Sequence, residues 1–420
     1  MAAERLLVFY QRELVGQLDR LDDGSLEFCY APSWLGSPGR FAVSLSLPIT
    51  GEAYAGAVVA SFFGNLLPEG AVRTLVARRL GLSEDNDFAL LRALGGECAG
   101  ALTLVVDEPP AGPGSYEEIK RREILKLCAD TAVAATLLGQ GRLRLSMAGA
   151  QDKLPVLVED GRFYLPLDGA PSTHLLKFSN RDFPNLPANE WFTTSLARRV
   201  GLPVVGLEVV LDGQACLVER FDRVRGVDGS VLRLHQEDFC QAFGLPRHTK
   251  YEQEGGPSFA RCFELVTRES SDPLADSDTL LRWQVFNALV GAADGHAKNL
   301  ALLYPALPSS PRLAPLYDLV CTRVYPRLST RLAMRVGSVD DPGQLTSKDW
   351  GELARATGVS APFLQKLVVG LADEVLGNVD AVAAELDAQL KATVGRDWLR
   401  PVVLKNARRV RKNCLPPKKG

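Results

Sequence analysis

Two polar clusters follow apolar stretches in the second half of the sequence. The first contains Asp294 and Asn299, five residues apart, and the second ends at Asp318 after the run Pro315-Leu-Tyr. Transfer of a phosphoryl group needs a carboxylate that orients the attacking hydroxyl, and Mg²⁺ needs oxygen ligands near the phosphates. Asp294 can therefore act as the base, and Asn299 and Asp318 can hold the metal ion.

The spacing of these residues is typical of a protein-kinase catalytic loop, in which an Asp precedes an Asn by five residues and a second metal ligand follows a strand. The usual kinase triplets His-Arg-Asp and Asp-Phe-Gly are absent. An alternative interpretation of residues 294–299 is an Asp-Gly turn followed by solvated polar side chains. Other segments must decide between the two.

Two further segments suit a nucleotide site. Residues 145–156 place small residues between strand-like runs, where backbone N–H groups can approach phosphates. This signal is weak alone, because one glycine in the segment does not make a Walker motif. Lys177 lies inside the strand-like run 173–178, where a charge is costly unless an anion pairs with it, although a strand lysine can also face solvent.

Residues 189–201 have apolar side chains at helical spacing and end in glycine, so we expect a helix with Glu190 in its first turn. Glu190 can serve there simply to complement the helix dipole. Residues 215–223 form an apolar strand that ends in charged residues. A kinase chain crosses from one lobe to the other at this point.

Taken together, six blocks of this sequence resemble the HipA family, whose members are bacterial toxin kinases of toxin–antitoxin modules. The resemblance runs from the first strand to about residue 400, and the ordered set is far more specific than any single block. The blocks are residues 146–153, 174–179, 218–223, 234–244, 294–299 and 313–318.

The resemblance implies a role for each matched residue. Asp294 would be the catalytic base, Asn299 and Asp318 the Mg²⁺ ligands, and Lys177 a contact of the ATP phosphates. Ser146 would be a regulatory autophosphorylation site, although its hydroxyl could instead cap a loop at the end of a strand. The remaining implied nucleotide contacts are Ala148, Gly149, Ala150, Gln151, Asp152, Lys153, Glu219, Arg220, Phe221, His296, Ala297, Lys298 and Tyr317, with Glu219 to Phe221 receiving adenine.

The implied function is that of an ATP-dependent serine/threonine protein kinase that arrests growth and supports persistence. The family suggests an aminoacyl-tRNA synthetase as substrate, a HipB-like helix-turn-helix antitoxin as partner, and operator DNA reached through that antitoxin. Two alternatives remain open at this stage. The chain could be a small-molecule or lipid kinase, or a non-catalytic co-repressor that binds the antitoxin.

The expected fold class is α+β. A bilobal protein-kinase-like fold, with a β-rich N-lobe and a helical C-lobe, would follow a small α/β N-terminal domain. We expect helices over residues 55–80, 88–94, 119–138 and 280–290. The expected divisions are an N-terminal subdomain over 1–107, a Pro- and Gly-rich linker over 108–115, the N-lobe over 116–232, the C-lobe over 233–404 and a basic tail over 405–420.

Composition fits an ordinary globular enzyme. The chain has 420 residues and a net charge of −2, with 46 % apolar and 23 % charged residues, so it should form two or three domains. The 8 cysteines are dispersed, and no Cys-x-x-Cys pair suggests zinc or redox chemistry. The absence of a long apolar run or a signal-peptide pattern predicts a cytoplasmic protein without a membrane span.

The end of the chain is basic. Residues 405–419 contain seven Lys or Arg residues and no acid. Such a tail is most often a solvated, partly disordered end. The alternative is contact with operator phosphates beside the antitoxin, in which case we expect removal of residues 405–420 to weaken DNA binding and to spare kinase activity.

Overall fold

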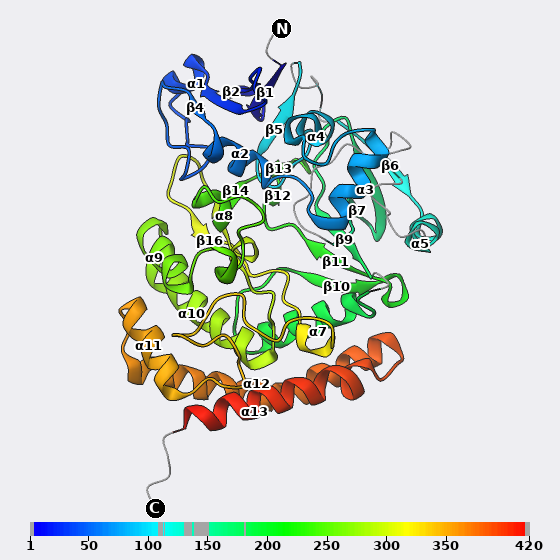
Figure 1. Ribbon diagram of the computed structural model, residues 1–420. Coiled ribbons are helices and arrows are strands. Elements are labelled where there is room, and N and C mark those ends of the chain that lie inside the picture. Colours follow the sequence, from blue (N-terminus) through cyan, green and yellow to red (C-terminus); the bar gives the residue numbers. More distant parts are fainter. Residues whose placement is uncertain are drawn as a thin grey trace, which may run out of the picture. The chain divides into compact units, whose positions relative to one another are not determined.

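The computed structural model describes residues 4–107, 112, 114–129, 137, 151–179 and 182–415. The chain divides into two compact units, each built from several segments (Figure 1). Unit 1 comprises residues 1–178, 217–249 and 301–311, and unit 2 comprises residues 179–216, 250–300 and 312–420. The units therefore do not follow the predicted divisions at residues 116 and 233.

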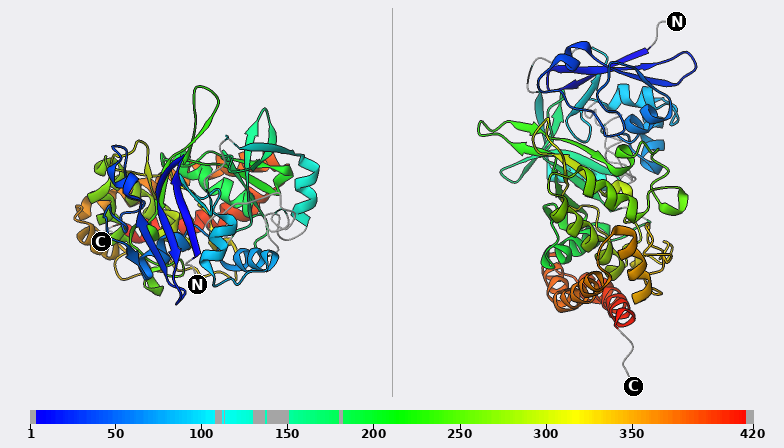
Figure 2. Two further views of the ribbon diagram at one scale, coloured as in Figure 1. Left: turned by 90° about the horizontal axis from the view of Figure 1, so that it is seen from above. Right: turned by 90° about the vertical axis from the view of Figure 1, so that its left-hand side faces the viewer.

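Unit 1 begins with an antiparallel sheet whose strand order is β4-β3-β2-β1-β5. Figure 2 shows β1 to β3 lying side by side, in blue. Leu6 and Val8 alternate with more exposed residues on β1 and are fully buried, the period-two pattern of a half-buried strand. The strands are β1 (Glu4–Tyr10), β2 (Glu13–Arg20), β3 (Leu26–Tyr30), β4 (Tyr54–Ala55) and β5 (Leu102–Val105).

Short helices pack beside this sheet within unit 1. They are α1 (Pro32–Gly36), α2 (Ala57–Gly64), α3 (Gly70–Leu80) and α4 (Asp87–Leu94). The expected helix over residues 55–80 is therefore two helices, separated by residues 65–69, and Ala55 belongs to β4. The expected helix over 88–94 is confirmed.

A second sheet of unit 1 carries the predicted phosphate-binding segments. Its strands in unit 1 follow the order β11-β9-β7-β8-β6, and the chain passes from unit 2 into unit 1 within β11. The elements are β6 (Ser115–Ile119), α5 (Arg121–Ala129), β7 (Lys153–Glu159), β8 (Arg162–Leu167), β9 (His174–Phe178) and β11 (Ala215–Glu219). The predicted helix start at Ile119 was wrong, because Ile119 pairs with Phe163 as the last residue of β6.

The rest of unit 1 consists of two small antiparallel pairings. Strands β12 (Arg223–Arg225) and β13 (Val231–Arg233) form a hairpin, and β14 (His235–Asp238) pairs with β15 (Ala301–Tyr304). Helix α8 (Phe239–Ala242) follows β14 and begins with a capping box at Asp238.

Unit 2 is mainly helical. Its elements are α7 (Leu186–Arg199), β10 (Leu207–Val210), α9 (Phe259–Glu269), α10 (Pro273–Val290), β16 (Arg312–Leu313), α11 (Ser347–Thr357), α12 (Ala361–Leu390) and α13 (Arg400–Cys414), the last preceded by a π-helical turn, Gly395–Leu399. Short 3₁₀ turns lie at Leu211–Gly213, Glu252–Glu254, Ala297–Asn299 and Thr322–Val324. The long helices α12 and α13 pack against each other and against α10 (Figure 2).

Helix α7 begins three residues earlier than expected. Pro187 lies in its first turn, a position where proline is tolerated because that backbone N–H needs no helical partner. Glu190 is consequently the fifth residue of α7 and not part of the first turn. It is buried, and the thiol of Cys216 donates a 3.4 Å hydrogen bond to Glu190 Oε2. A simple dipole role for Glu190 is therefore excluded.

The chain end through residue 414 is not a loose tail. Helix α13 buries Val403, Ala407, Val410 and Cys414, which recur at the spacing of one helical face. This apolar period outweighs the surrounding positive charge, so the prediction of a partly disordered segment was wrong for residues 405–414.

Candidate active site

The predicted base lies on a tight loop at the end of α10. Helix α10 begins at an Asp272 cap and stops at Gly291, whose φ of 76° is the left-handed conformation in which glycine commonly ends helices. The side chain of Asp294 is 54 % exposed, whereas His296, Lys298 and Asn299 are buried. The loop therefore presents one carboxylate to solvent.

Hydrogen bonds from two other segments hold this loop. The hydroxyl of Thr322 accepts from the Ala293 N–H at 2.8 Å and donates to the Gly291 carbonyl at 3.1 Å. The amide of Asn406 on α13 donates to the carbonyls of Ala288 (2.5 Å) and Leu289 (2.9 Å), which end α10. Helix α13 thus helps to hold the loop that carries Asp294.

The second polar cluster lies beside the first, as the sequence predicted. The hydroxyl of Tyr317 donates a 2.8 Å hydrogen bond to the carbonyl of Lys298, so the residues before Asp318 and Asn299 are in contact. Asp318 has a φ of 56°, a left-handed conformation that is uncommon for a residue other than glycine. Such strain is often kept at functional sites, where the surrounding structure enforces it.

Helix α7 fixes the chain beyond Asp318. The Asn189 side chain accepts from the N–H of Cys321 at 2.9 Å and donates to its carbonyl at 3.0 Å. Asn189 is fully buried, so this paired contact is shielded from water. The sequence placed Asn189 on a helix but offered no sign of this role.

Asn299 and Asp318 fit the needs of a hard metal ion. The Oδ1 atom of Asn299 is buried and has no hydrogen-bond partner within the described part of the chain. A buried amide oxygen without a partner is costly unless a ligand satisfies it. Magnesium is commonly bound by one or two protein oxygen groups together with substrate phosphates and water. The described ranges contain no cluster of three or more His, Cys, Asp or Glu side chains that could hold a metal ion.

In unit 1, two of the predicted phosphate contacts lie opposite each other. Lys153 on β7 pairs with Lys177 on β9 in an antiparallel register, which places their side chains on one face of the sheet. Like charges directly opposite each other are unfavourable, so each ammonium group needs negative charge close by. Near them, the Gln151 amide donates to the Phe178 carbonyl at 3.0 Å.

The predicted adenine-binding segment, Glu219 to Phe221, begins at the last residue of β11. The guanidinium of Arg220 is buried and binds Glu97 at 2.8 Å and Asp222 at 2.8 Å. Because the Arg220 side chain already pairs with these two acids, only its backbone remains as a predicted contact of adenine. Arg223 completes the cluster through Glu97 (3.1 Å) and Asp222 (2.7 Å).

All four residues of this buried cluster stay charged near neutral pH. They are Glu97, Arg220, Asp222 and Arg223. Burial alone would raise the pKa of Asp222, but Arg220 and Arg223 hold that pKa well below its ordinary value. Burial also opposes ionisation of Glu97, yet the same two arginines keep its pKa low. For Arg223, burial and the neighbouring Arg220 lower the pKa to about 10. A buried cluster of this kind is sensitive to loss of one partner.

Several predicted residues lie outside the described ranges. They are Ser146, Ala148, Gly149 and Ala150.

Sequence reasoning also missed a residue that contacts the base. The hydroxyl of Tyr251 donates a short hydrogen bond to Asp294 Oδ1. Tyr251 precedes Asp294 by 43 residues, and only the glycine pair Gly255-Gly256 hinted at a structured turn nearby.

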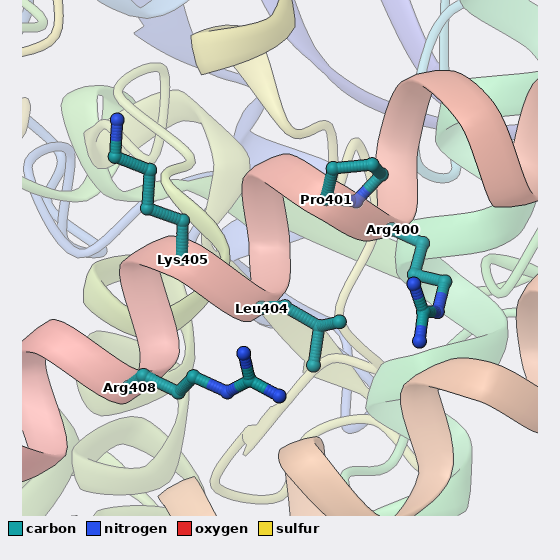
Figure 3. A pocket seen from close by; sticks show the side chains of 5 residues that line it. All are labelled: Arg400, Pro401, Leu404, Lys405 and Arg408. Atoms are coloured by element: carbon teal, nitrogen blue, oxygen red, sulfur yellow. The ribbon is translucent and has the colours of Figure 1, made fainter.

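A cationic groove lies on α13, remote in sequence from these residues. Figure 3 shows its lining, which comes entirely from this helix. Arg400 pairs with Asp380, whereas Lys405 and Arg408 form no ion pair within the described residues. The groove has a volume of about 500 Å³ and is lined by Arg400, Pro401, Leu404, Lys405 and Arg408.

Comparison with known proteins agrees with the predicted family and fold. Residues 6–105 match the model of the HipA N-terminal domain, and residues 145–383 match that of the HipA-like C-terminal domain. The serine/threonine-protein kinase toxin HipA of Shewanella oneidensis is 33 % identical over 331 residues, which cover 75 % of this chain and 74 % of that protein. Y4mE of Sinorhizobium fredii, which is named as a kinase, is 40 % identical over 395 residues. The matched region covers 92 % of this chain and 93 % of Y4mE.

A solved structure extends the likeness to the fold. HipA from the S. oneidensis complex of HipA, HipB and operator DNA superposes with a TM-score of 0.81 at 28 % identity, covering 97 % of this chain and 96 % of that one. The predicted fold class, α+β and protein-kinase-like, is confirmed. These domains and relatives define a kinase. The chain belongs to the HipA family.

Among the described residues, none of the helices combines the length and apolar character needed to cross a bilayer. The cysteines whose side chains are described form no disulfide with one another.

Proposed function

We propose that the protein is an ATP-dependent serine/threonine protein kinase toxin of a HipA-type toxin–antitoxin module. The observation that carries this proposal is the loop of unit 2, where Asp294 is exposed and the buried Oδ1 of Asn299 has no hydrogen-bond partner among the described residues. The Tyr317 contact brings the Asp318 segment to the same loop. A base and two metal-capable oxygen groups are the minimum set for phosphoryl transfer.

Each group has a distinct task in this proposal. Asp294 accepts the proton of the substrate hydroxyl, and Asn299 and Asp318 hold Mg²⁺, which when bound neutralises charge on the ATP phosphates. By resemblance to the family, Gln151, Asp152, Lys153 and Lys177 of unit 1 are proposed as nucleotide contacts, and so are His296, Ala297 and Lys298 of unit 2. Backbone groups of Glu219 to Phe221 receive adenine.

We also propose that Ser146 is autophosphorylated and that this modification shuts the enzyme down. A phosphate group adds about −1.5 to −2 charge near the expected site of another polyanion. The like charges would repel each other, which favours release of the nucleotide. The protein substrate in this proposal is an aminoacyl-tRNA synthetase, whose phosphorylation would arrest growth.

The partner proposal rests on the S. oneidensis HipA, which was solved in complex with HipB and operator DNA. We propose a HipB-like helix-turn-helix antitoxin as the partner of this chain, with operator DNA reached mainly through the antitoxin. The cationic groove on α13 adds phosphate contacts, because Lys405 and Arg408 are free to bind anions. These contacts carry charge and no base specificity.

The deciding experiment incubates wild type, Asp294→Asn and Ser146→Ala with Mg²⁺ and labelled ATP, and locates phosphate by mass spectrometry. Expected are phosphate on Ser146 in wild type, transfer reduced to a small residual rate in Asp294→Asn, and retained trans-labelling by Ser146→Ala. Asp397→Asn is a matched control, since Asp397 is an exposed carboxylate elsewhere in unit 2. Labelling of a lipid or small-molecule acceptor alone would favour the alternative kinase classes. Nucleotide binding without any transfer would favour the co-repressor.

The DNA proposal needs charge substitutions, not a truncation. Removal of residues 405–420 would delete Asn406, which holds the end of α10, so it would damage the catalytic loop as well. We expect Lys405→Ser with Arg408→Ser to weaken binding of the antitoxin complex to operator DNA and to flatten its salt dependence. Lys366→Ser on α12 is the control. Equal affinities at low salt would contradict the proposal.

A further inference from the structure

Tyr251 contacts Asp294, the proposed base, from the position that precedes the 3₁₀ turn Glu252–Glu254. Its hydroxyl donates to Asp294 Oδ1, and its ring packs edge-on against the His296 imidazole, with centroids 5.1 Å apart and an interplanar angle of 85°. All three residues belong to unit 2. The tyrosine therefore touches the loop at two points, one polar and one aromatic.

The segment around Tyr251 is held independently of its hydroxyl. The Lys250 carbonyl accepts from the Ala297 N–H at 3.4 Å. The neighbouring Glu252 donates its N–H to the Ala333 carbonyl (3.0 Å) and accepts from the Arg335 N–H (2.7 Å). Because the backbone is anchored by these bonds, loss of the hydroxyl should leave the ring in place.

A glycine keeps this anchored turn compact. A Cβ at Gly256 would lie 2.7 Å from the Tyr251 carbonyl oxygen, closer than such contacts are found. The turn therefore needs glycine here, and its packing fixes the direction in which the Tyr251 side chain leaves the backbone.

The contacts of Asp294 are unequal between its two oxygens. Tyr251 binds Oδ1, and His296 Nε2 lies 3.8 Å from the same atom. Within the described residues, Oδ2 has no hydrogen bond, and the side chain is 54 % exposed. A short, exposed carboxylate would otherwise rotate freely, so a donor on Oδ1 selects the orientation in which Oδ2 faces outward.

We propose that Tyr251 is a positioning residue for phosphoryl transfer, which presents Asp294 Oδ2 to the hydroxyl of the protein substrate. This inference rests on the proposed function. In the step it serves, the substrate oxygen forms a bond to the γ-phosphorus, and the bond from that phosphorus to the β,γ-bridging oxygen breaks to leave ADP. The hydroxyl proton moves to Oδ2, while Tyr251 retains its own proton.

The variant Tyr251→Phe isolates the hydrogen bond. It removes the hydroxyl and keeps the ring against His296. We expect kcat for transfer to fall about tenfold, part of the gain that a positioned base supplies. The dissociation constant for Mg-ATP and the Tm should stay at their wild-type values, because neither depends on the orientation of Asp294. Tyr54→Phe removes another exposed hydroxyl bond, to Pro48, and serves as the control.

A double-mutant cycle tells positioning from a general structural effect. If Tyr251 acts through Asp294, then Tyr251→Phe should change the residual activity of Asp294→Asn by less than about twofold. Additive losses would overturn the inference, as would an unchanged or raised kcat in Tyr251→Phe while wild type transfers phosphate. Absence of transfer by wild type would overturn the proposed function itself, and the inference with it.

Discussion

Glu237 makes the stability of unit 1 depend on pH. This carboxyl on β14 is fully buried and accepts hydrogen bonds from Ser44 Oγ (2.5 Å), the Tyr304 hydroxyl (2.6 Å) and the Leu45 N–H (3.1 Å). Within the described part of the chain it forms no ion pair. Burial therefore outweighs the three donors and raises its pKa to about 7.

The direction of the effect follows from proton binding. Between pH 4.5, the ordinary pKa of Glu237, and pH 7, its folded pKa, the folded state binds this proton more tightly than the unfolded state. The free energy of unfolding therefore falls as pH rises through this window and is level above it. The whole window corresponds to about 3 kcal/mol, because each pH unit across it contributes about 1.4 kcal/mol.

The variant Glu237→Gln removes the titration and keeps the shape. The Gln amide retains an acceptor oxygen for Leu45 and Tyr304, and its NH₂ can donate to Ser44 Oγ. Urea unfolding of wild type and variant, measured at pH 5 and pH 8, gives the comparison in which other titrating groups cancel. We expect the variant to gain stability relative to wild type by about 3 kcal/mol between these pH values.

Glu52→Gln, at an exposed position of unit 1, is the control and should leave the pH dependence of wild type unchanged. An equal pH dependence in Glu237→Gln and wild type would refute the reasoning, since it would mean that Glu237 does not titrate in this range.

Three other substitutions test the buried cluster around Glu97 and the packing of the loop that carries Asp294. Glu97→Gln should lower the free energy of unfolding by about 3–5 kcal/mol, because it leaves two buried arginines short of a charge partner; a loss under about 0.5 kcal/mol in urea unfolding would contradict this. Gly295→Ala should cost about 1–3 kcal/mol and lower transfer, since its Cβ would lie 2.5 Å from Asn287 Nδ2, whereas Gly377→Ala on α12 meets open space and should stabilise slightly. Asn406→Ala should lower Tm and kcat together by freeing the end of α10; an unchanged kcat would show that α13 does not support the loop.

The cluster of Asp294 and Asn299 could be proposed from the sequence because its residues lie close together along the chain. Asp294 and Asn299 lie within six residues of each other, and they follow α10, whose residues 283–290 are all buried. Spacing also suggested that Asp318 belongs to the same site, and the Tyr317 contact agrees with it. Fixed short separations along the chain make such clusters readable.

Long-range contacts were not predictable in the same way. The partnership of Glu97 with Arg220 spans 123 residues, and nothing in either segment names the other. Tyr251 had the same difficulty, because its role depends on a turn whose direction is set by packing. The left-handed backbone of Asp318 also leaves no mark in residue types.

The error at the chain end had a different cause. The prediction for residues 405–419 rested on their positive charge and not on the apolar period of Val403, Ala407, Val410 and Cys414. Charged residues on an amphipathic helix occupy its outer face, so a dense basic count is compatible with a well-packed helix. The hydrophobic period was the better guide.

The segmented composition of the two units has a consequence for synthesis on the ribosome. Unit 1 needs residues 301–311, which include Tyr304, the donor to Glu237. Those residues emerge after Asp294 and before α11, α12 and α13 of unit 2. A nascent chain that stops short of residue 311 has completed neither unit, so translation must pass this residue before the first compact unit can close.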